Sequence, residues 1–310
     1  TGTISVTTPL GKGTSTTNFT VNTAPSITGQ STSAQTICQG VGATSMSVTA
    51  TGSGLTYQWY SNTANDNTTG TSISTATNAT YTSPTATAGT IYYYVIVTGN
   101  CNSVTSATAA VVVNPITVIS TPPTGSTYCQ SATATAISVT ATGTGTFTYQ
   151  WYSNTVNNNT SGTAIGAATS STYTPSTATA GTLYYYVIVT GGCGAATSST
   201  ATVIVNPSTT ISVQPAGATY CQNGTATALS VTATGTGTLT YQWYSNTINN
   251  NTSGTVIGAA TSSTYTPPTT TSGTRYYYVI VTGGCGSITS NTATVLINPI
   301  SSITSNPSAT

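Results

Sequence analysis

A repeat of 92 residues constrains this chain more than any other feature of its sequence. The tryptophans stand at positions 59, 151 and 243, each inside the same hexapeptide, Tyr-Gln-Trp-Tyr-Ser-Asn, so both spacings are 92. A run of three tyrosines keeps this register and begins at Tyr92, Tyr184 and Tyr276. Self-similarity at a fixed period is the signature of an array of one structural unit. The sequence therefore predicts three copies of one unit.

Asn-Pro pairs mark the joints between these units. They occur at 114–115, 206–207 and 298–299, again 92 residues apart. Proline cannot donate to a strand ladder, so it ends the preceding strand and stiffens a short linker. The predicted domains are repeat 1 at 25–114, repeat 2 at 115–206 and repeat 3 at 207–298, with the start of a further repeat at 299–310. We expect the chain to be a piece of a longer secreted protein.

Residues 1–24 do not follow the repeat. Residues 3–9 alternate and predict a strand, Gly11 and Gly13 predict a turn, and residues 18–21 predict a second strand. This pattern resembles the last hairpin of IPT/TIG domains, which are immunoglobulin-like domains of secreted proteins. The resemblance implies that residues 1–24 are the tail of a preceding domain.

Alternation of apolar and polar residues defines the strands of a unit. In repeat 2, Ile137, Val139 and Ala141 share one face of a strand, and Met46 and Leu229 replace Ile137 in the other repeats. Such volume-conserving exchanges are typical of a buried site. The pattern predicts strands at 116–119, 137–142, 148–153, 171–174, 182–190 and 200–205, with a tight turn at 191–194.

Several short strands with regular turns and a central tryptophan on the third strand indicate an immunoglobulin-like sandwich. Helix formers such as Glu and Lys are nearly absent, which argues against a helical solenoid. A β-helix would need a much shorter period. The predicted fold class is all-β, with tandem immunoglobulin-like β-sandwiches in a linear array, and Trp59, Trp151 and Trp243 are the predicted core residues.

The near absence of charge excludes most chemistry. Lys12, Asp66 and Arg275 are the only charged side chains, and there is no histidine. General acid–base catalysis and a Ser-His-Asp triad need titratable groups that this sequence does not supply. A basic surface for nucleic acid and a ligand set for a metal are missing as well. We therefore expect no enzyme activity, no cofactor or metal, no nucleic-acid partner and, without an apolar run of about 20 residues, no membrane span.

The motifs of the unit resemble those of a known family. Cys-Gln, Ser-Val-Thr-Ala, Tyr-Gln-Trp-Tyr-Ser-Asn, Tyr-Tyr-Tyr-Val, Gly-Cys-Gly and a terminal Val-Asn-Pro recur across residues 25–298. They look like the immunoglobulin-like repeats of giant Bacteroidota surface proteins, typically exported by the type IX secretion system, which include gliding-motility adhesins. The resemblance implies an extracellular, cell-surface location.

Three functions fit these observations. The first is the structural stalk of an extracellular fibre or adhesin, with neighbouring repeats as partners and lateral self-association into bundles through uncharged sheet edges. The second is glycan binding through an exposed aromatic strip on the second face of the sheet, for which Tyr60, Tyr152 and Tyr244 are the candidate contacts. Packing within the fold is the competing interpretation of these tyrosines. The third is a spacer attached to an enzyme outside this segment.

An Asn-x-Thr/Ser sequon recurs in one loop of each repeat, at Asn67, Asn159 and Asn251. The motif is short and frequent in sequences rich in Asn and Thr. We interpret it as polar loop composition.

Six cysteines in three equivalent pairs indicate an oxidising compartment. The first member of each pair precedes a turn between the first two strands, and the second lies in the turn between the last two, which are opposite poles of an immunoglobulin sandwich. A disulfide tolerates a Cα separation of only about 4.4 to 6.8 Å. We therefore favour bonds between neighbouring repeats, Cys38–Cys193 and Cys129–Cys285, with Cys101 and Cys221 bonded outside this segment. An atypical strand order would instead allow Cys38–Cys101, Cys129–Cys193 and Cys221–Cys285.

Overall fold

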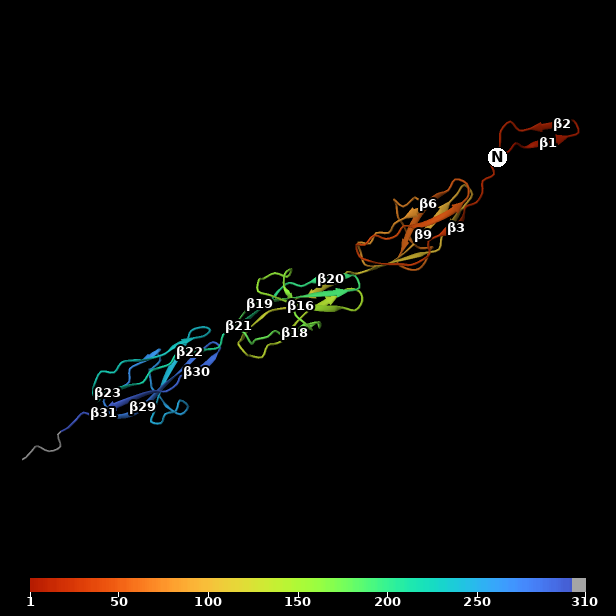
Figure 1. Ribbon diagram of the computed structural model, residues 1–310. Helices are drawn as coiled ribbons and strands as arrows, with labels where there is room; N and C mark the ends of the chain where they lie inside the picture. Colours follow the sequence, from red (N-terminus) through yellow and green to blue (C-terminus); the bar gives the residue numbers. More distant parts are fainter. Residues whose placement is uncertain (303–310) are drawn as a thin grey trace, which may run out of the picture. The chain divides into compact units, whose positions relative to one another are not determined.

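The computed structural model describes residues 1–302. All the secondary-structure elements in this range are β-strands (Figure 1). The predicted all-β class of tandem immunoglobulin-like domains is therefore confirmed. Most of the segment 299–310, predicted to begin a further repeat, lies outside the described residues.

The three repeats contain the same succession of strands. The segment 1–24 before them forms β1 (Ser5–Thr8) and β2 (Gly11–Thr14). Repeat 1 contains β3 (Ser26–Gln30), β4 (Gln35–Cys38), β5 (Met46–Thr51), β6 (Thr56–Asn62), β7 (Thr71–Ser72), β8 (Thr80–Tyr81), β9 (Gly89–Thr98), β10 (Ser103–Thr105) and β11 (Ala109–Asn114). Repeat 2 contains β12 (Val118–Thr121), β13 (Ser126–Cys129), β14 (Ile137–Ser138), β15 (Thr140–Thr142), β16 (Thr148–Asn154), β17 (Thr163–Ala164), β18 (Thr172–Tyr173), β19 (Gly181–Gly191), β20 (Gly194–Thr197) and β21 (Ala201–Asn206). Repeat 3 contains β22 (Thr210–Val213), β23 (Ala218–Cys221), β24 (Leu229–Ser230), β25 (Thr232–Thr234), β26 (Thr240–Asn246), β27 (Thr255–Val256), β28 (Thr264–Tyr265), β29 (Gly273–Gly283), β30 (Gly286–Thr289) and β31 (Ala293–Asn298).

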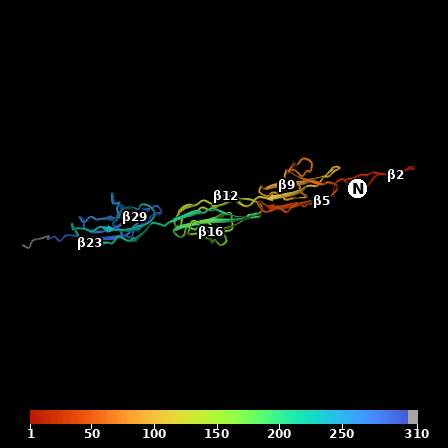
Figure 2. The same cartoon turned by 90° about the horizontal axis from the view of Figure 1, so that it is seen from above.

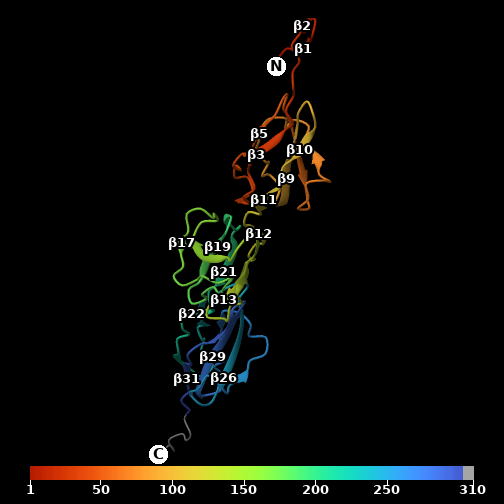
Figure 3. The same cartoon turned by 90° about the vertical axis from the view of Figure 1, so that its right-hand side faces the viewer.

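Each repeat has one large sheet and a smaller opposing layer. In repeat 1 the large sheet has the order β4-β11-β9-β6-β7, with β10 paired to β9, and the second sheet is β3-β5-β8. Figure 2 shows β5 and β9, which belong to these two sheets. In repeat 3 the neighbours β26, β29 and β31 lie side by side in the large sheet (Figure 3).

The strand before each first cysteine was not predicted. β4, β13 and β23 each pair in parallel with the last strand of their own repeat, for example with Cys129 opposite Asn206. The sequence Ser-Thr-Tyr-Cys of β13 has no apolar alternation, so periodicity could not reveal it. Its ladder hydrogen bonds place the first cysteine of each repeat at the end of an edge strand.

The tryptophans lie in the centre of the sandwiches. Trp151 and Trp243 are fully buried and Trp59 is 3% exposed. The indole Nε1 of Trp151 donates to the carbonyl of Ser170 at 2.9 Å, so burial leaves no unpaired donor. Its ring lies 6.0 Å from that of Tyr173, and the same contacts recur around Trp59 and Trp243.

The segment 1–24 departs from the prediction. The second strand is β2, not residues 18–21, and Gly11 and Gly13 belong to this strand instead of a turn. The chain reverses at Pro9 and Leu10, between the paired residues Thr8 and Gly11. Proline has no amide proton and suits the reversal better than the ladder. Phe19 forms only an isolated bridge with Gly2.

The described chain divides into two compact units, and the division passes through repeat 2. The first unit joins residues 1–121 to segments 140–149 and 188–197 of repeat 2. The second unit joins the rest of repeat 2 to repeat 3. The two compact units therefore do not coincide with the sequence repeats.

Candidate functional site: the cysteine joints and the tyrosine layer

The first cysteine of each repeat ends its edge strand. Cys38, Cys129 and Cys221 are the last residues of β4, β13 and β23. The backbone amide that follows each one still bonds to the last strand, as Gln130 N does to the carbonyl of Asn206 at 2.8 Å. These cysteines are thus held at a fixed position by backbone hydrogen bonds.

The second cysteine of repeats 2 and 3 lies in a two-residue turn. β19 and β20 pair up to Gly191 and Gly194, and Cys193 stands between them. Gly194 has a φ of 95°, which favours glycine because it has no Cβ. The turn of repeat 3 is the same, with Gly286 at a φ of 98° beside Cys285. This tight turn presents the sulfur at the tip of the hairpin.

Two disulfides join neighbouring repeats. Cys38 is bonded to Cys193 and Cys129 is bonded to Cys285, each with a Cα–Cα distance of 5.4 Å. None of the three bonds considered within a repeat is present, because their members are bonded elsewhere or free. Cys101 and Cys221 are free and exposed. Each is the equivalent of a cysteine that is bonded in another repeat.

Polar contacts surround each disulfide. The hydroxyl of Thr117, just after the joint between repeats 1 and 2, donates to the carbonyl of Gly194 at 2.7 Å. Thr209 makes the same bond to Gly286 at 2.7 Å. Gly192 N donates to the carbonyl of Thr144 at 2.6 Å, which fixes the turn on its inner side. The same arrangement of cysteine, turn and threonine therefore recurs at the two bonded joints.

The candidate tyrosine strip is only partly exposed. Tyr152 is half-buried and stacks on Tyr186, with ring centroids 5.0 Å apart and planes inclined by 5°. Tyr60 on Tyr94 and Tyr244 on Tyr278 repeat the arrangement. The expected exposed strip is thus one ring face in each repeat, because the other face is covered by a second tyrosine.

The Asn-rich loop covers this second tyrosine. Gly162 N donates to the hydroxyl of Tyr186 at 3.0 Å, and Tyr186 is 3% exposed. A Cβ on Gly162 would come within 2.7 Å of the Tyr186 ring, so the loop needs glycine there. Gly70 and Gly254 stand in the same place over Tyr94 and Tyr278. The glycine that recurs at this position was the sequence signal for the outer layer, which consists of the stacked tyrosines and the Asn-rich loop over them. Reasoning from alternation missed this layer.

The sequon asparagines are part of the same layer. Nδ2 of Asn159 donates to the carbonyl of Ser198 at 2.8 Å, and Asn67 and Asn251 make the same bond to Ser106 and Ser290. These half-buried amides anchor the loop on the segment between the last two strands of each repeat. The bond gives the asparagines a structural role.

Titratable groups are few and their shifts have local causes. Hydrogen bonds from Thr68 and Thr69 lower the pKa of Asp66 to about 2. Burial raises the pKa of Tyr93 and of Tyr185 to about 12 and raises that of Tyr277. Within residues 1–302, no group of three or more His, Cys, Asp or Glu side chains could hold a metal ion. No helix in the described part of the chain is long and apolar enough to cross a membrane.

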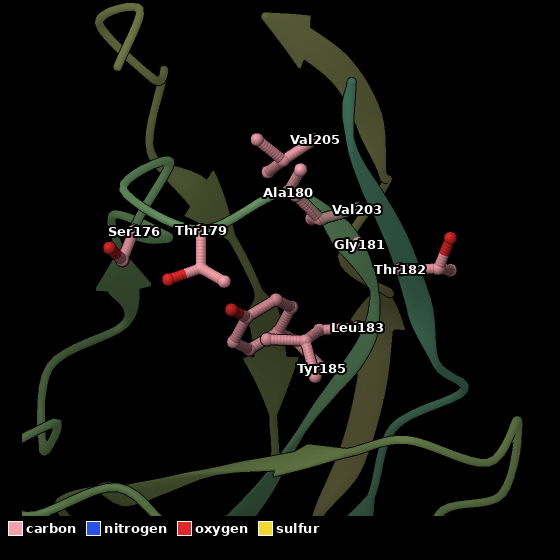
Figure 4. Close-up of a pocket in the computed structure, with 9 residues that line it drawn as sticks. All are labelled: Ser176, Thr179, Ala180, Gly181, Thr182, Leu183, Tyr185, Val203 and Val205. Atoms are coloured by element: carbon pink, nitrogen blue, oxygen red, sulfur yellow. The ribbon is translucent and has the colours of Figure 1, made fainter. Parts of the chain in front are cut away.

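A shallow groove of about 270 Å³ opens on the inner face of the large sheet in repeat 2. Leu183, Tyr185 and Thr179 face the shared space, whereas the side chain of Thr182 points away from it (Figure 4). Repeat 3 has a similar groove in which Arg275 takes the position of Leu183. Hydroxyl groups and apolar surface line the repeat 2 groove, which offers no side chain suited to acid–base chemistry.

The sandwiches and their joints define a class of tandem immunoglobulin-like domains. The chain is similar to the solved "I-band fragment I67-I69 from titin", with 15% identity, a TM-score of 0.52, and coverage of 90% of this chain and 99% of that chain. It is also similar to the "3Ig structure of titin domains I67-I69 E-to-A mutated variant", with 15% identity, a TM-score of 0.51 and the same coverage. At this identity the likeness shows the fold alone.

The chain belongs to the family described as "Domain of unknown function (DUF8696)". The family model matches residues 27–115, 119–207 and 209–299, one match in each repeat. No curated protein matches the sequence.

Proposed function

We propose that this chain is the structural, non-catalytic stalk of an extracellular fibre or adhesin. The observation that carries the proposal is the pair of disulfides, which join successive repeats in the same register. A bond at each joint restricts bending between domains, and a binding module acting alone would not need such bonds. Calcium, which stiffens some domain arrays, needs clustered carboxylates, and this chain has one.

Disulfides persist in oxidising compartments and so support an extracellular location. The resemblance of the repeat motifs to giant Bacteroidota surface proteins supports placing this stalk at a cell surface, with export by type IX secretion. The resemblance of residues 1–24 to an IPT/TIG hairpin supports a preceding immunoglobulin-like domain.

The stalk function is tested by replacement. In the producing cell, residues 25–298 are exchanged for unrelated immunoglobulin-like domains, matched in number and cross-linked between neighbours. A stalk requires only reach and stiffness, so we expect surface display and adhesion to be retained. Loss of adhesion with normal display would contradict the proposal, and a replacement without cross-links serves as the matched control.

Glycan binding is the second candidate, and the half-exposed ring of Tyr152 with its counterparts Tyr60 and Tyr244 favours it. Aromatic faces stack on sugar rings, and here the underlying tyrosine holds each ring in place. A glycan array probed with the intact chain tests this function. Binding that is lost in the triple Tyr→Ala variant of these positions would favour it over the stalk.

The unbonded cysteines extend the same proposal along the protein. Cys101 has the position of Cys193 and Cys285, and Cys221 has that of Cys38 and Cys129. We propose that both are bonded to repeats outside this segment. Sheet edges with Thr and Ser instead of charge support lateral association of such stalks, with little dependence on salt.

A further inference from the structure

The two disulfides are interleaved along the chain. Cys129 lies between Cys38 and Cys193 in the sequence, and Cys193 lies between Cys129 and Cys285. The two covalent loops span 155 and 156 residues and share the segment 129–193. In each repeat, a disulfide therefore gives a covalent connection that avoids part of the backbone of that repeat.

We infer that these cross-links carry tension through the first strands of repeat 1, the segment 129–193 of repeat 2 and the last strands of repeat 3, and that they cap the extension of the chain. In repeat 1, a pull from the N-terminus passes through β3 and β4 to Cys38 and crosses to Cys193. Residues 39–114 of that repeat are outside the shortest covalent path. In repeat 3, the path from Cys285 to the joint at 298–299 contains only β30 and β31.

Repeat 2 connects the two cross-links. Three backbone segments run between them, residues 38–129, 129–193 and 193–285. The segment 129–193 is the shortest of the three, so the other two remain slack when it is fully extended. Unfolding of any repeat therefore cannot separate the two cross-links by more than this segment allows.

In each repeat, the strand that ends at the first cysteine pairs in parallel with the last strand. β13 and β21 run in the same direction with Cys129 opposite Asn206, and β4 with β11 and β23 with β31 repeat the pair. If Cys101 and Cys221 are bonded as proposed above, short spans such as the segment 193–221 carry the tension. Each repeat would then contribute two strands to each of two covalent lines. This extension rests on the proposed stalk function, whereas the cap on extension rests on the two observed bonds.

Single-molecule stretching of the whole chain from its two ends tests the inference. The shortest covalent route follows 1–38, 129–193 and 285–310, about 126 residues, against about 309 when the bonds are reduced. At about 3.5 Å per residue the fully extended lengths are about 440 Å and 1,080 Å. We expect the first under non-reducing conditions and the second after reduction. A non-reduced length near the reduced one would overturn the inference.

Variants separate this connectivity from bonds within repeats. In a Cys101→Ser/Cys221→Ser double variant, the reference for all measurements, the route stays at about 126 residues. Bonding of Cys129 to Cys193 in that variant would instead give about 245 residues. Adding Cys129→Ser should lengthen the route to about 154 residues, because only the Cys38–Cys193 bond remains. Full extension does not depend on native packing, and the outcome is independent of display and adhesion, so failure here is distinguishable from failure of the stalk function.

Discussion

The turn between the last two strands differs between repeat 1 and repeat 2. In repeat 2, β19 continues to Gly191, β20 begins at Gly194, and Cys193 is 7% exposed in a disulfide. In repeat 1, β9 ends at Thr98, β10 is one residue shorter than β20, and Cys101 is free and exposed. The two turns have the same place in nearly identical sandwiches.

The two turns differ both in their joints and in their own residues, because Gly192 and Gly194 of repeat 2 correspond to Asn100 and Asn102 of repeat 1. Thr117 lies at the joint beside the bonded turn and donates to Gly194, whereas Pro25 stands at the equivalent position before repeat 1 and has no hydroxyl. This hydrogen bond lies within repeat 2, where it ties the residues just after the joint to the bonded turn. The bonded turns thus combine a disulfide, a glycine on each side of the cysteine and a threonine at the joint, and the free turn of repeat 1 has none of the three.

Removing a cross-link should have the largest effect on this comparison. We expect Cys38→Ser/Cys193→Ser to lower the free energy of unfolding by about 5 kcal/mol, because the bond closes a long loop in the unfolded chain. Urea denaturation measures the loss. The Cys101→Ser/Cys221→Ser variant is the matched control and should change stability by less than about 0.5 kcal/mol; equal losses in the two variants would contradict the assigned bonds.

A core change should weaken one repeat and leave its joints bonded. Trp151→Ala removes a fully buried ring and its bond to Ser170, at a cost of about 3–5 kcal/mol. Hydrogen exchange, followed repeat by repeat, measures where protection is lost. We expect the loss to concentrate in repeat 2, with Trp151→Phe as a milder control. Uniform loss across all three repeats would show that they do not unfold separately.

The joint hydrogen bond should contribute less. Thr117→Val keeps the shape of this buried side chain but removes its bond to Gly194, at an expected cost of about 1 kcal/mol. Thr121→Val, at an exposed position near the same joint, is the control. Equal effects at the two positions, measured by urea denaturation, would refute a role for the bond.

Stability should be nearly flat from pH 4 to 9 and should fall in alkali. Burial raises the pKa of Tyr93 and of Tyr185 to about 12 in the folded chain. A raised acid pKa contributes stability that is present below the unfolded value of about 10 and is lost as the pH rises toward 12. Thermal midpoints across this range test the sign, and a shift of many degrees between pH 4 and 7 would contradict it.

The smallest effect is expected at Asp66. Asn158 and Asn250 occupy its position in the other repeats and accept equivalent hydrogen bonds from the following residues, so Asp66→Asn should leave stability at pH 7 almost unchanged. The pKa of Asp66 is lowered to about 2, so its ionised form contributes stability that is present above about pH 3.8 and lost as the pH falls toward 2. Acid titration of the thermal midpoint should show that loss in the original chain and not in the variant.

Alternation predicted the core strands because each has one buried face. The paired positions Ile137 and Val139 and the central Trp151 are examples, and all three are buried. β13 escaped prediction because it is held by ladder hydrogen bonds at a sheet edge, with little apolar burial. The buried Tyr186 escaped because a polar loop covers it from the outside, which depends on Gly162 and not on periodicity.

The most direct test of the interleaved joints is disulfide mapping of the non-reduced chain. Trypsin would cut only after Lys12 and Arg275, so pepsin digestion in acid is preferred, where thiolates are too scarce for disulfides to exchange. We expect linked peptides that contain Cys38 with Cys193 and Cys129 with Cys285. A linked peptide that joins Cys129 to Cys193 would contradict the account.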